Sequence, residues 1–146
     1  GNNDRVIQLR SGRLVFPIAV HSQDGADFTG VAKATAWISD DIGKTWYRAE
    51  TLLTLNLKSR TGLQEPGMVE LSQDNHLIMF ARTDQKVQYV SHSKDGGDTW
   101  SPVEPSTLKS PVSPAAIEAL PRTNTPLCGR NNPEATAKEM ATKRKP

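Results

Sequence analysis

Short apolar runs separated by turn residues make up most of this chain, and that pattern predicts β-strands. Before residue 130, no window of helical length shows apolar residues that keep recurring at helical spacing. The runs are bounded by Gly, Ser, Asn and Asp, as strands of an all-β protein are. We therefore expect strands over the ranges Arg5–Leu9, Arg13–Val20, Ala32–Ile38, Pro66–Leu71, His76–Arg82 and Val87–His92.

The strand pattern repeats along the chain. VIQL-RSG-RLVFPI (residues 6–18) and MVEL-SQDN-HLIMFA (residues 68–81) both read as strand, tight turn, strand, and each is followed by a further extended segment. A third unit begins at SPAAIEALP, residues 113–121. Four strands in roughly 50 residues indicate the blades of a β-propeller. The second strands, LVFPI and LIMFA, are apolar at consecutive positions, which predicts that both of their faces are covered.

One eight-residue motif, S-x-D-x-G-x-T-W, closes each of the first two units. It occurs as SDDIGKTW and again 54 positions later as SKDGGDTW. The Asp can accept backbone N–H groups, the Gly permits a positive φ, the Thr restarts a strand, and the Trp fills space beside the hairpin. We interpret both copies as structural hairpin turns, with Ser39, Asp41, Gly43, Thr45, Trp46, Ser93, Asp95, Gly97, Thr99 and Trp100 as their defining residues.

The alternative for the motif is a cation site built from Asp40 and Asp41, or from Asp95 with Asp98. Calcium sites require more oxygen ligands, at alternating positions, than these pairs provide. We therefore predict no metal site and no cofactor.

A charged pair is predicted at the open end of one hairpin. If Ser72–Asn75 forms the loop, paired positions sum to 147, so that Pro66 faces Ala81 and Glu65 faces Arg82. Directly opposed residues point to the same side with Cβ atoms about 5 Å apart. The spacing alone is also compatible with an ordinary structural ion pair at a strand end, which contributes little to stability.

Composition and charge exclude some classes of binding partner. With 146 residues the chain has room for one domain with a core, and its net charge is +2. Basic residues do not cluster as a nucleic-acid footprint would require, and no apolar run approaches a membrane span. We expect neither nucleic acid nor membrane as a partner. The single cysteine, Cys128, excludes an intrachain disulfide and leaves the compartment undecided.

The two motifs at blade spacing resemble the Asp-box, or bacterial neuraminidase, repeat, and residues 3–121 resemble sialidases. That resemblance implies a six-bladed β-propeller, cleavage of terminal sialic acids from glycans, and a secreted or periplasmic location. It implies that Glu65 is the base that activates a tyrosine nucleophile. It also implies that Arg82 is one of three arginines that bind the substrate carboxylate, which suits the planar guanidinium. Such enzymes are the Tyr-using exception among glycosidases.

The sequence departs from the sialidase pattern in several places. No residue matches the early arginine, the acid/base aspartate, the late arginine or the nucleophilic tyrosine of the family. Arg13 precedes VFP but does not fit the family's usual Arg-Ile-Pro form. We expect Tyr47 and Tyr89, both near Asp boxes, to be packing residues.

The repeats fill about two and a half blades at roughly 40–50 residues per blade. We expect residues 1–121 to form a propeller segment that carries the Asp boxes at 39–46 and 93–100. We expect residues 122–146 to be a disordered or weakly helical tail, because the third unit lacks an evident second strand. Open propeller edges favour self-association.

Two functions follow as hypotheses. In the first, the chain is a segment of an exo-α-sialidase-like glycoside hydrolase that binds a sialylated glycan or similar carbohydrate and is inactive in isolation. In the second, it is a non-catalytic Asp-box propeller segment, used as a scaffold or glycan-binding module.

Overall fold

Three antiparallel sheets follow one another along the chain in the computed structural model, which describes residues 6–24, 27–71, 74–113, 115–119 and 126–130. Blade 1 contains β1 (Ile7–Gln8), β2 (Leu14–Asp24), β3 (Asp27–Ser39) and β4 (Tyr47–Arg48). Blade 2 contains β5 (Gln64–Glu70), β6 (Leu77–Arg82), β7 (Val87–Ser93) and β8 (Glu104–Lys109). A third sheet pairs β9 (Ala115–Ala119) with β10 (Pro126–Arg130).

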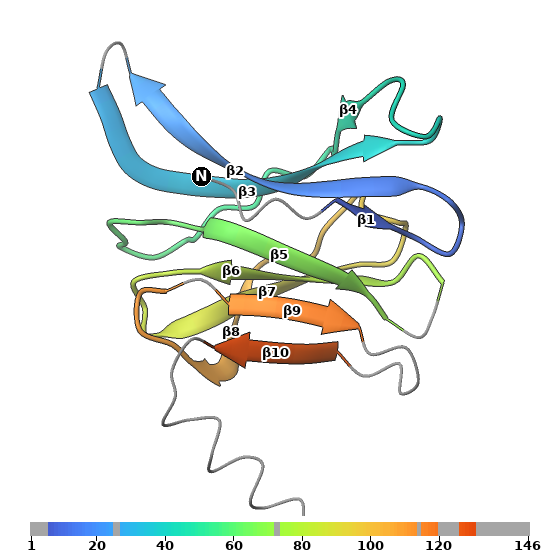
Figure 1. Ribbon diagram of the computed structural model, residues 1–146. Coiled ribbons are helices and arrows are strands. Elements are labelled where there is room, and N and C mark those ends of the chain that lie inside the picture. The colour runs from blue at the N-terminus through green and yellow to red at the C-terminus, as the bar shows by residue number, and fades with distance from the viewer. Residues whose placement is uncertain (1–5, 25–26, 72–73, 114, 120–125, 131–146) are drawn as a thin grey trace, which may run out of the picture.

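Within each blade, neighbouring strands in the sequence are also neighbours in the sheet. The three sheets lie one above another, with β5 beside β9 (Figure 1). The expected all-β fold, a partial propeller of four-stranded antiparallel units, is therefore confirmed. Among the described residues, no helix is long and apolar enough to cross a membrane.

The third unit does have a second strand, contrary to the sequence prediction. Residues Pro126–Arg130 pair along their length with Ala115–Ala119, in part of what we expected to be a disordered or weakly helical tail. The short run Leu127-Cys128 gave too weak an apolar signal, whereas the backbone of β9 offers an edge that any extended segment can complete. The rest of the expected tail, residues 131–146, lies outside the described residues.

The main core lies between blades 1 and 2. Blade 1 contributes small and branched side chains that are fully buried, namely Val15, Ala34, Ala36 and Ile38. Blade 2 contributes mostly larger ones, namely Met68, Leu77, Met79, Tyr89 and Trp100, together with Ala81. The alanines of β3 let the two blades approach closely, and the longer side chains of blade 2 fill the space that remains.

The consecutive apolar positions of the second strands are covered unequally. In β6, Leu77 and Met79 are buried and Ile78 and Phe80 are half-buried, as expected for a strand with a neighbour on each side. In β2, the residues of LVFPI follow the same alternation: Val15 and Pro17 are buried, and Leu14, Phe16 and Ile18 are half-buried. Coverage ends beyond this run, since Val20 is 38% exposed.

Both Asp boxes form the same hydrogen-bonded turn. In the first, Asp41 accepts the Thr45 N–H at 2.8 Å and the Thr45 hydroxyl at 2.7 Å, and Ser39 accepts the Gly43 N–H at 2.8 Å. The Trp46 indole donates to the Gly43 carbonyl at 3.1 Å. Hydrogen bonds from the Thr45 backbone and hydroxyl lower the pKa of Asp41, so the turn needs this carboxylate ionised.

The second box repeats these contacts in a more buried setting. Asp95 accepts the Thr99 N–H at 3.0 Å, and the Trp100 indole donates to Gly97 at 2.8 Å. Trp100 is 7% exposed, whereas Trp46 is 37% exposed. Burial opposes ionisation of Asp95, but hydrogen bonds from Thr99 and Ser93 outweigh it and lower its pKa. The difference in burial arises because the second box packs against blade 1.

Arg13 joins the two boxes across the blade interface. Its Nε donates to Asp40 of the first box at 2.7 Å, and its Nη1 donates to Asp98 of the second at 2.6 Å. The Tyr47 hydroxyl lies 3.1 Å from both carboxylates and can donate to one of them at a time. Burial and the hydrogen bond to Asp40 raise the pKa of Tyr47 to about 12. Tyr47 was expected to be a packing residue. Its hydroxyl instead takes part in the clamp that Arg13, Asp40, Tyr47 and Asp98 form, and the residue is 42% exposed.

The first box contains a residue with backbone strain that a substitution by glycine can remove. Ile42 has φ +62° and is 81% exposed, and the equivalent residue of the second box is Gly96, with φ +75°. A left-handed conformation costs a residue with a Cβ about 1–2 kcal/mol, and glycine avoids this cost. Glycine also loses more conformational entropy on folding, which reduces the net gain in stability. We predict that Ile42→Gly raises the free energy of unfolding by about 1 kcal/mol, measured by urea denaturation.

The matched control is Gly96→Ala. Its new Cβ would lie 3.2 Å from Arg13 Nη1 at a positive φ, so we expect this variant to lose stability. A lower unfolding free energy for Ile42→Gly would show that the exposed isoleucine makes a contact that outweighs its backbone strain.

A histidine pair at one end of blade 2 should make stability depend on pH. The His76 and His92 rings lie 5.6 Å apart, and the buried Nδ1 of His92 has no hydrogen-bond partner among the described residues. Burial, then the nearby His76 and Lys94, lower the pKa of His92 from its ordinary 6.5, and Glu104 partly opposes them.

Because the unfolded chain binds this proton at a higher pH than the folded chain, the stability that neutral His92 contributes is lost as the pH falls below about 6.5. We predict a lower urea midpoint at about pH 5.5 than at about pH 7.5, and a smaller difference in His92→Gln. Equal pH dependence in the variant and the parent chain would contradict this assignment.

Candidate functional site

Glu65 and Arg82 lie at the end of blade 2 that is opposite the Asp boxes. The far end of β5 is fixed by Glu70, whose carboxylate accepts the Asn75 N–H at 3.1 Å, and Asn75 in turn accepts the Gly96 N–H of the second box at 2.9 Å. β5 starts at Gln64 and β6 ends at Arg82, so both candidate residues stand at the other end of this hairpin (Figure 1).

The two side chains form an ion pair. Arg82 Nε lies 3.2 Å from Glu65 Oε2, and the two side chains are 20% and 23% exposed. Both atoms are buried, but their angles do not make a hydrogen bond, and neither atom has another hydrogen-bond partner among the described residues. The charges are therefore compensated, while the hydrogen-bonding capacity of both groups is left partly unused.

We predicted the pair of Glu65 and Arg82 from a strand register that is wrong by one residue at this end of the hairpin. From Glu70 to Gly67 the paired positions sum to 147 as expected, but Arg82 pairs with Gln64 rather than Glu65. Glu65 and Pro66 together oppose the one residue Ala81, which makes a β-bulge. Glu65 has φ +47°, and Pro66 has no N–H to offer the ladder, so this dipeptide cannot continue regular pairing.

Gln64 connects the ion pair to blade 1. Arg82 Nη2 donates to Gln64 Oε1, and Gln64 Nε2 donates to the carbonyl of Gly30 in β3 at 2.8 Å. The side chain of Gln64 thus fixes one edge of the guanidinium and ties it to the neighbouring sheet. Sequence reasoning missed Gln64; its only signal was its place directly before the Glu-Pro dipeptide.

The loops around this end are held by Asp84. Its carboxylate accepts the Ser59 hydroxyl at 2.6 Å and the Arg60 N–H at 2.8 Å. These hydrogen bonds, led by that from Ser59, hold the pKa of Asp84 at about 2. Asp84 follows β6 and the Ser59–Gly62 turn precedes β5, so this contact joins the two chain segments that flank Arg82 and Glu65.

The arrangement can bind an anion. Arg82 uses one hydrogen bond of its guanidinium on Gln64 and is otherwise opposed only by Glu65 among the described residues, so N–H donors remain for a ligand. Guanidinium groups of this kind recognise carboxylates with paired hydrogen bonds. The described residues contain no group of three or more His, Cys, Asp or Glu side chains placed to hold a metal ion.

The remaining candidates lie elsewhere. Arg13 and Tyr47 belong to the clamp at the Asp-box end. Tyr89 is 7% exposed in β7, two strands away from β5, and packs in the core as expected. The structure therefore brings Glu65 and Arg82 together and adds Gln64, but it brings no tyrosine to them.

Comparison with known proteins places the chain among propeller proteins. A family model described as the BNR repeat-like domain matches residues 3–144. A search of curated proteins finds no match. Among solved structures, the NanB sialidase of Streptococcus pneumoniae is 31% identical with a TM-score of 0.51, over 70% of this chain and 13% of that protein.

Two further structures share the fold at lower identity. A Trypanosoma rangeli sialidase bound to sialic acid is 22% identical with a TM-score of 0.60, over 84% of this chain and 19% of its own. A Dyadobacter fermentans protein of unknown function is 21% identical with a TM-score of 0.66, over 82% of this chain and 31% of its own.

This chain thus spans between 13% and 31% of the length of these three proteins. The family match over nearly the whole sequence, together with the sialidase neighbours, settles its relationship: the chain belongs to the family of BNR repeat-like domains, within the sialidase superfamily.

Proposed function

We propose that this chain is a segment of an exo-α-sialidase-like glycoside hydrolase, with Glu65 and Arg82 in its substrate site. The observation that supports this proposal is their ion pair at the end of blade 2 away from the Asp boxes. A Glu-Pro that opens one strand and an Arg that closes its partner are the types and positions that the sialidase resemblance implies.

Arg82 would bind the carboxylate of a terminal sialic acid. The substrate carries a fixed negative charge, and a half-buried guanidinium binds such a charge more strongly than an exposed one, because water screens it less. Gln64 holds the Nη2 edge of Arg82, so the ligand would approach along the remaining N–H groups. Glu65 would hold the guanidinium of Arg82 in position before the ligand binds.

Glu65 would act as the base that removes the proton from a tyrosine nucleophile. A phenol is a poor nucleophile at neutral pH unless a neighbouring carboxylate takes its proton. The sequence has two tyrosines, and neither is suited to this role. Tyr47 belongs to the clamp, where its pKa is about 12, and Tyr89 stands two strands away. The nucleophile would come from another part of a longer protein, and this chain alone would bind without turning over.

The missing tyrosine also favours a second candidate function. A propeller segment with an anion-binding arginine but no nucleophile can serve as a glycan-binding module or scaffold. Both functions share Arg82 as a carboxylate ligand, and they differ in whether Glu65 takes part in a reaction.

Binding of N-acetylneuraminic acid tests the shared part of the proposal. We expect weak binding in the millimolar range, measured by ¹H–¹⁵N NMR titration of the 146-residue chain. Hydrogen bonds to charged groups contribute about 1.5–3 kcal/mol, so Arg82→Ala should weaken binding roughly tenfold or more. Arg82→Lys should also weaken it, because lysine cannot form the paired contacts.

Two controls make this test specific. Arg48→Ala removes an exposed arginine of β4 and should leave the affinity unchanged. The methyl ester of the same sugar lacks the carboxylate charge and should bind no better to the parent chain than to Arg82→Ala. Unchanged affinity in Arg82→Ala would remove Arg82 from the site.

Turnover of a fluorogenic sialoside tests the catalytic part. We expect no hydrolysis by the purified chain above the buffer rate, because neither tyrosine can act as the nucleophile beside Glu65. Hydrolysis that disappears in Glu65→Gln would overturn the expectation of an inactive chain, and would assign the reaction to this segment.

A further inference from the structure

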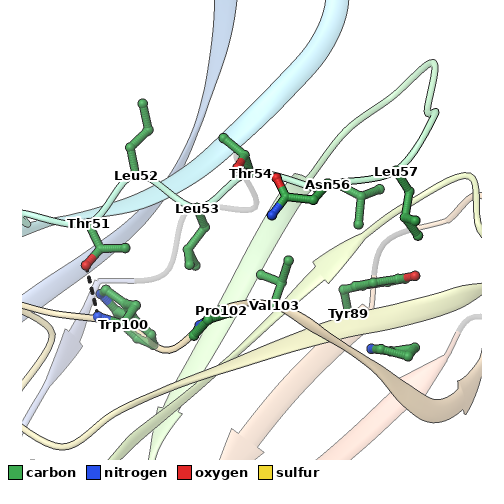
Figure 2. A pocket seen from close by; sticks show the side chains of 12 residues that line it. Thr51, Leu52, Leu53, Thr54, Asn56, Leu57, Tyr89, Trp100, Pro102 and Val103 are labelled. Atoms are coloured by element: carbon green, nitrogen blue, oxygen red, sulfur yellow. Dashed lines mark hydrogen bonds between the residues drawn. The ribbon is translucent and has the colours of Figure 1, made fainter.

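The linker from blade 1 to blade 2 is held at both of its ends, so that Gln64, the residue directly after it, has a fixed position. At the start of the linker, the Trp100 N–H donates to the Thr51 hydroxyl at 3.1 Å (Figure 2). At its end, the Leu63 N–H donates to the Ala32 carbonyl of β3 at 2.8 Å. The backbone of Gln64 is therefore placed by the packing of the two blades.

The acceptor for the Gln64 amide comes from an irregular point of β3. The register between β2 and β3 shifts between His21 and Gln23, and Gly30 lies on the opposite strand at this shift, with φ +75°. The Gly30 carbonyl accepts a hydrogen bond from Gln64 Nε2 at 2.8 Å. Because a residue with a Cβ rarely adopts such a φ, glycine permits the backbone conformation that presents this carbonyl to blade 2.

The two neighbours of the Gln64 amide permit only one orientation of it. A guanidinium has N–H donors and no acceptor, so Arg82 Nη2 requires the amide oxygen as its partner. A backbone carbonyl only accepts, so Gly30 requires the amide nitrogen. Glutamine satisfies both neighbours at once, whereas an ionised carboxylate has no donor for the Gly30 carbonyl.

Gln64 also holds the guanidinium without adding a charge. Glu65 already compensates Arg82, with its Oε2 atom 3.2 Å from Arg82 Nε. A second carboxylate at position 64 would give this pair an excess of negative charge, which would repel an anionic ligand. An uncharged acceptor orients Arg82 and does not compete with the ligand for its positive charge.

We propose that Gln64 is a positioning residue that sets the affinity of Arg82 for carboxylates, with the Gly30 carbonyl of blade 1 as its anchor. Gln64 acts through the guanidinium, whose Nη2 atom it holds, and not by contact with the ligand. This inference rests on the function proposed for Arg82, and it assigns the neutrality of position 64 to the selection of an anionic ligand.

Gln64→Glu tests the need for a neutral side chain. The variant keeps the length of the side chain and an oxygen for Arg82, but it adds a negative charge. At about pH 7.5 it should bind N-acetylneuraminic acid roughly tenfold or more weakly than the parent chain, in the same NMR titration. Gln8→Glu adds the same charge at an exposed position of β1 and should bind like the parent.

Gln64→Met tests the orientation of Arg82, because it removes both hydrogen bonds without a change of charge. It should weaken binding about two- to tenfold. In ¹H–¹⁵N spectra of the arginine side chains, the Nη groups of Arg82 should give separate signals in the parent chain, where Gln64 restrains their rotation, and averaged signals in Gln64→Met. A tie between the blades with no role in orienting Arg82 would lower the urea midpoint in this variant and leave the signals separate.

Arg82→Ala separates this inference from the proposed function. If Arg82→Ala binds the sugar like the parent chain, the function proposed for Arg82 fails. If it loses affinity while both Gln64 variants bind like the parent, that function stands and the inference on Gln64 is overturned. Averaged Nη signals of Arg82 in the parent chain would overturn it as well, whatever the ligand. Should Gln64→Met not fold, Gln64→Glu, which keeps the shape of the side chain, decides the question.

Discussion

The close approach of β3 to the start of β5 is the constraint on which the rest of the structure depends. Gly62 pairs with Ala32, and a Cβ at Gly62 would lie 2.2 Å from the Ala32 carbonyl oxygen, which no side chain can tolerate. The Ala32 N–H and carbonyl make 2.8 Å hydrogen bonds to Thr61 and Leu63. This contact brings Gln64 within reach of the Gly30 carbonyl, and Gln64 in turn orients Arg82. The position of the candidate site is therefore set by the packing of the two blades as much as by the hairpin that contains it.

The two ends of the blades are stabilised by different chemistry. At one end, the Asp boxes satisfy their own polar groups, and Arg13 neutralises Asp40 and Asp98 with short hydrogen bonds, so that little capacity is left for a ligand. At the other end, Glu65 and Arg82 are paired in charge but not in hydrogen-bond geometry. A fully satisfied network rigidifies a fold, and a partly satisfied one can still bind. This contrast explains why the repeated motif is structural and the single-copy pair is the better candidate for function.

Sequence reasoning reached the fold because the signals were local and repeated. Apolar runs bounded by turn residues gave the strands of blades 1 and 2, and the two S-x-D-x-G-x-T-W motifs gave the blade spacing. It failed at two places. The strand β10 forms because β9 offers an edge, which the apolar pattern of residues 126–130 does not show. The register shifts at Glu65 because Pro66 has no N–H for the ladder, so that a bulge replaces regular pairing. The ion pair was still predicted correctly, because the long side chain of Arg82 reaches Glu65 although its backbone pairs with the preceding residue, Gln64.

The position of Glu65 inside a strand separates it from the other residues with an unusual backbone conformation. Four described non-glycine residues have a positive φ, namely Ile42, Glu65, Asn75 and Lys86. Ile42, Asn75 and Lys86 lie in turns between strands, where the chain reverses direction, but Glu65 lies inside β5. A left-handed residue within a strand persists only where surrounding contacts impose it, and such strain gathers at functional sites. Here the bulge directs the Glu65 carboxylate to Arg82 although Gln64 is the paired residue. Pro66 already excludes regular pairing at this point, and the bulge that replaces it brings the Glu65 carboxylate to the guanidinium rather than to solvent, in agreement with the role proposed for this residue.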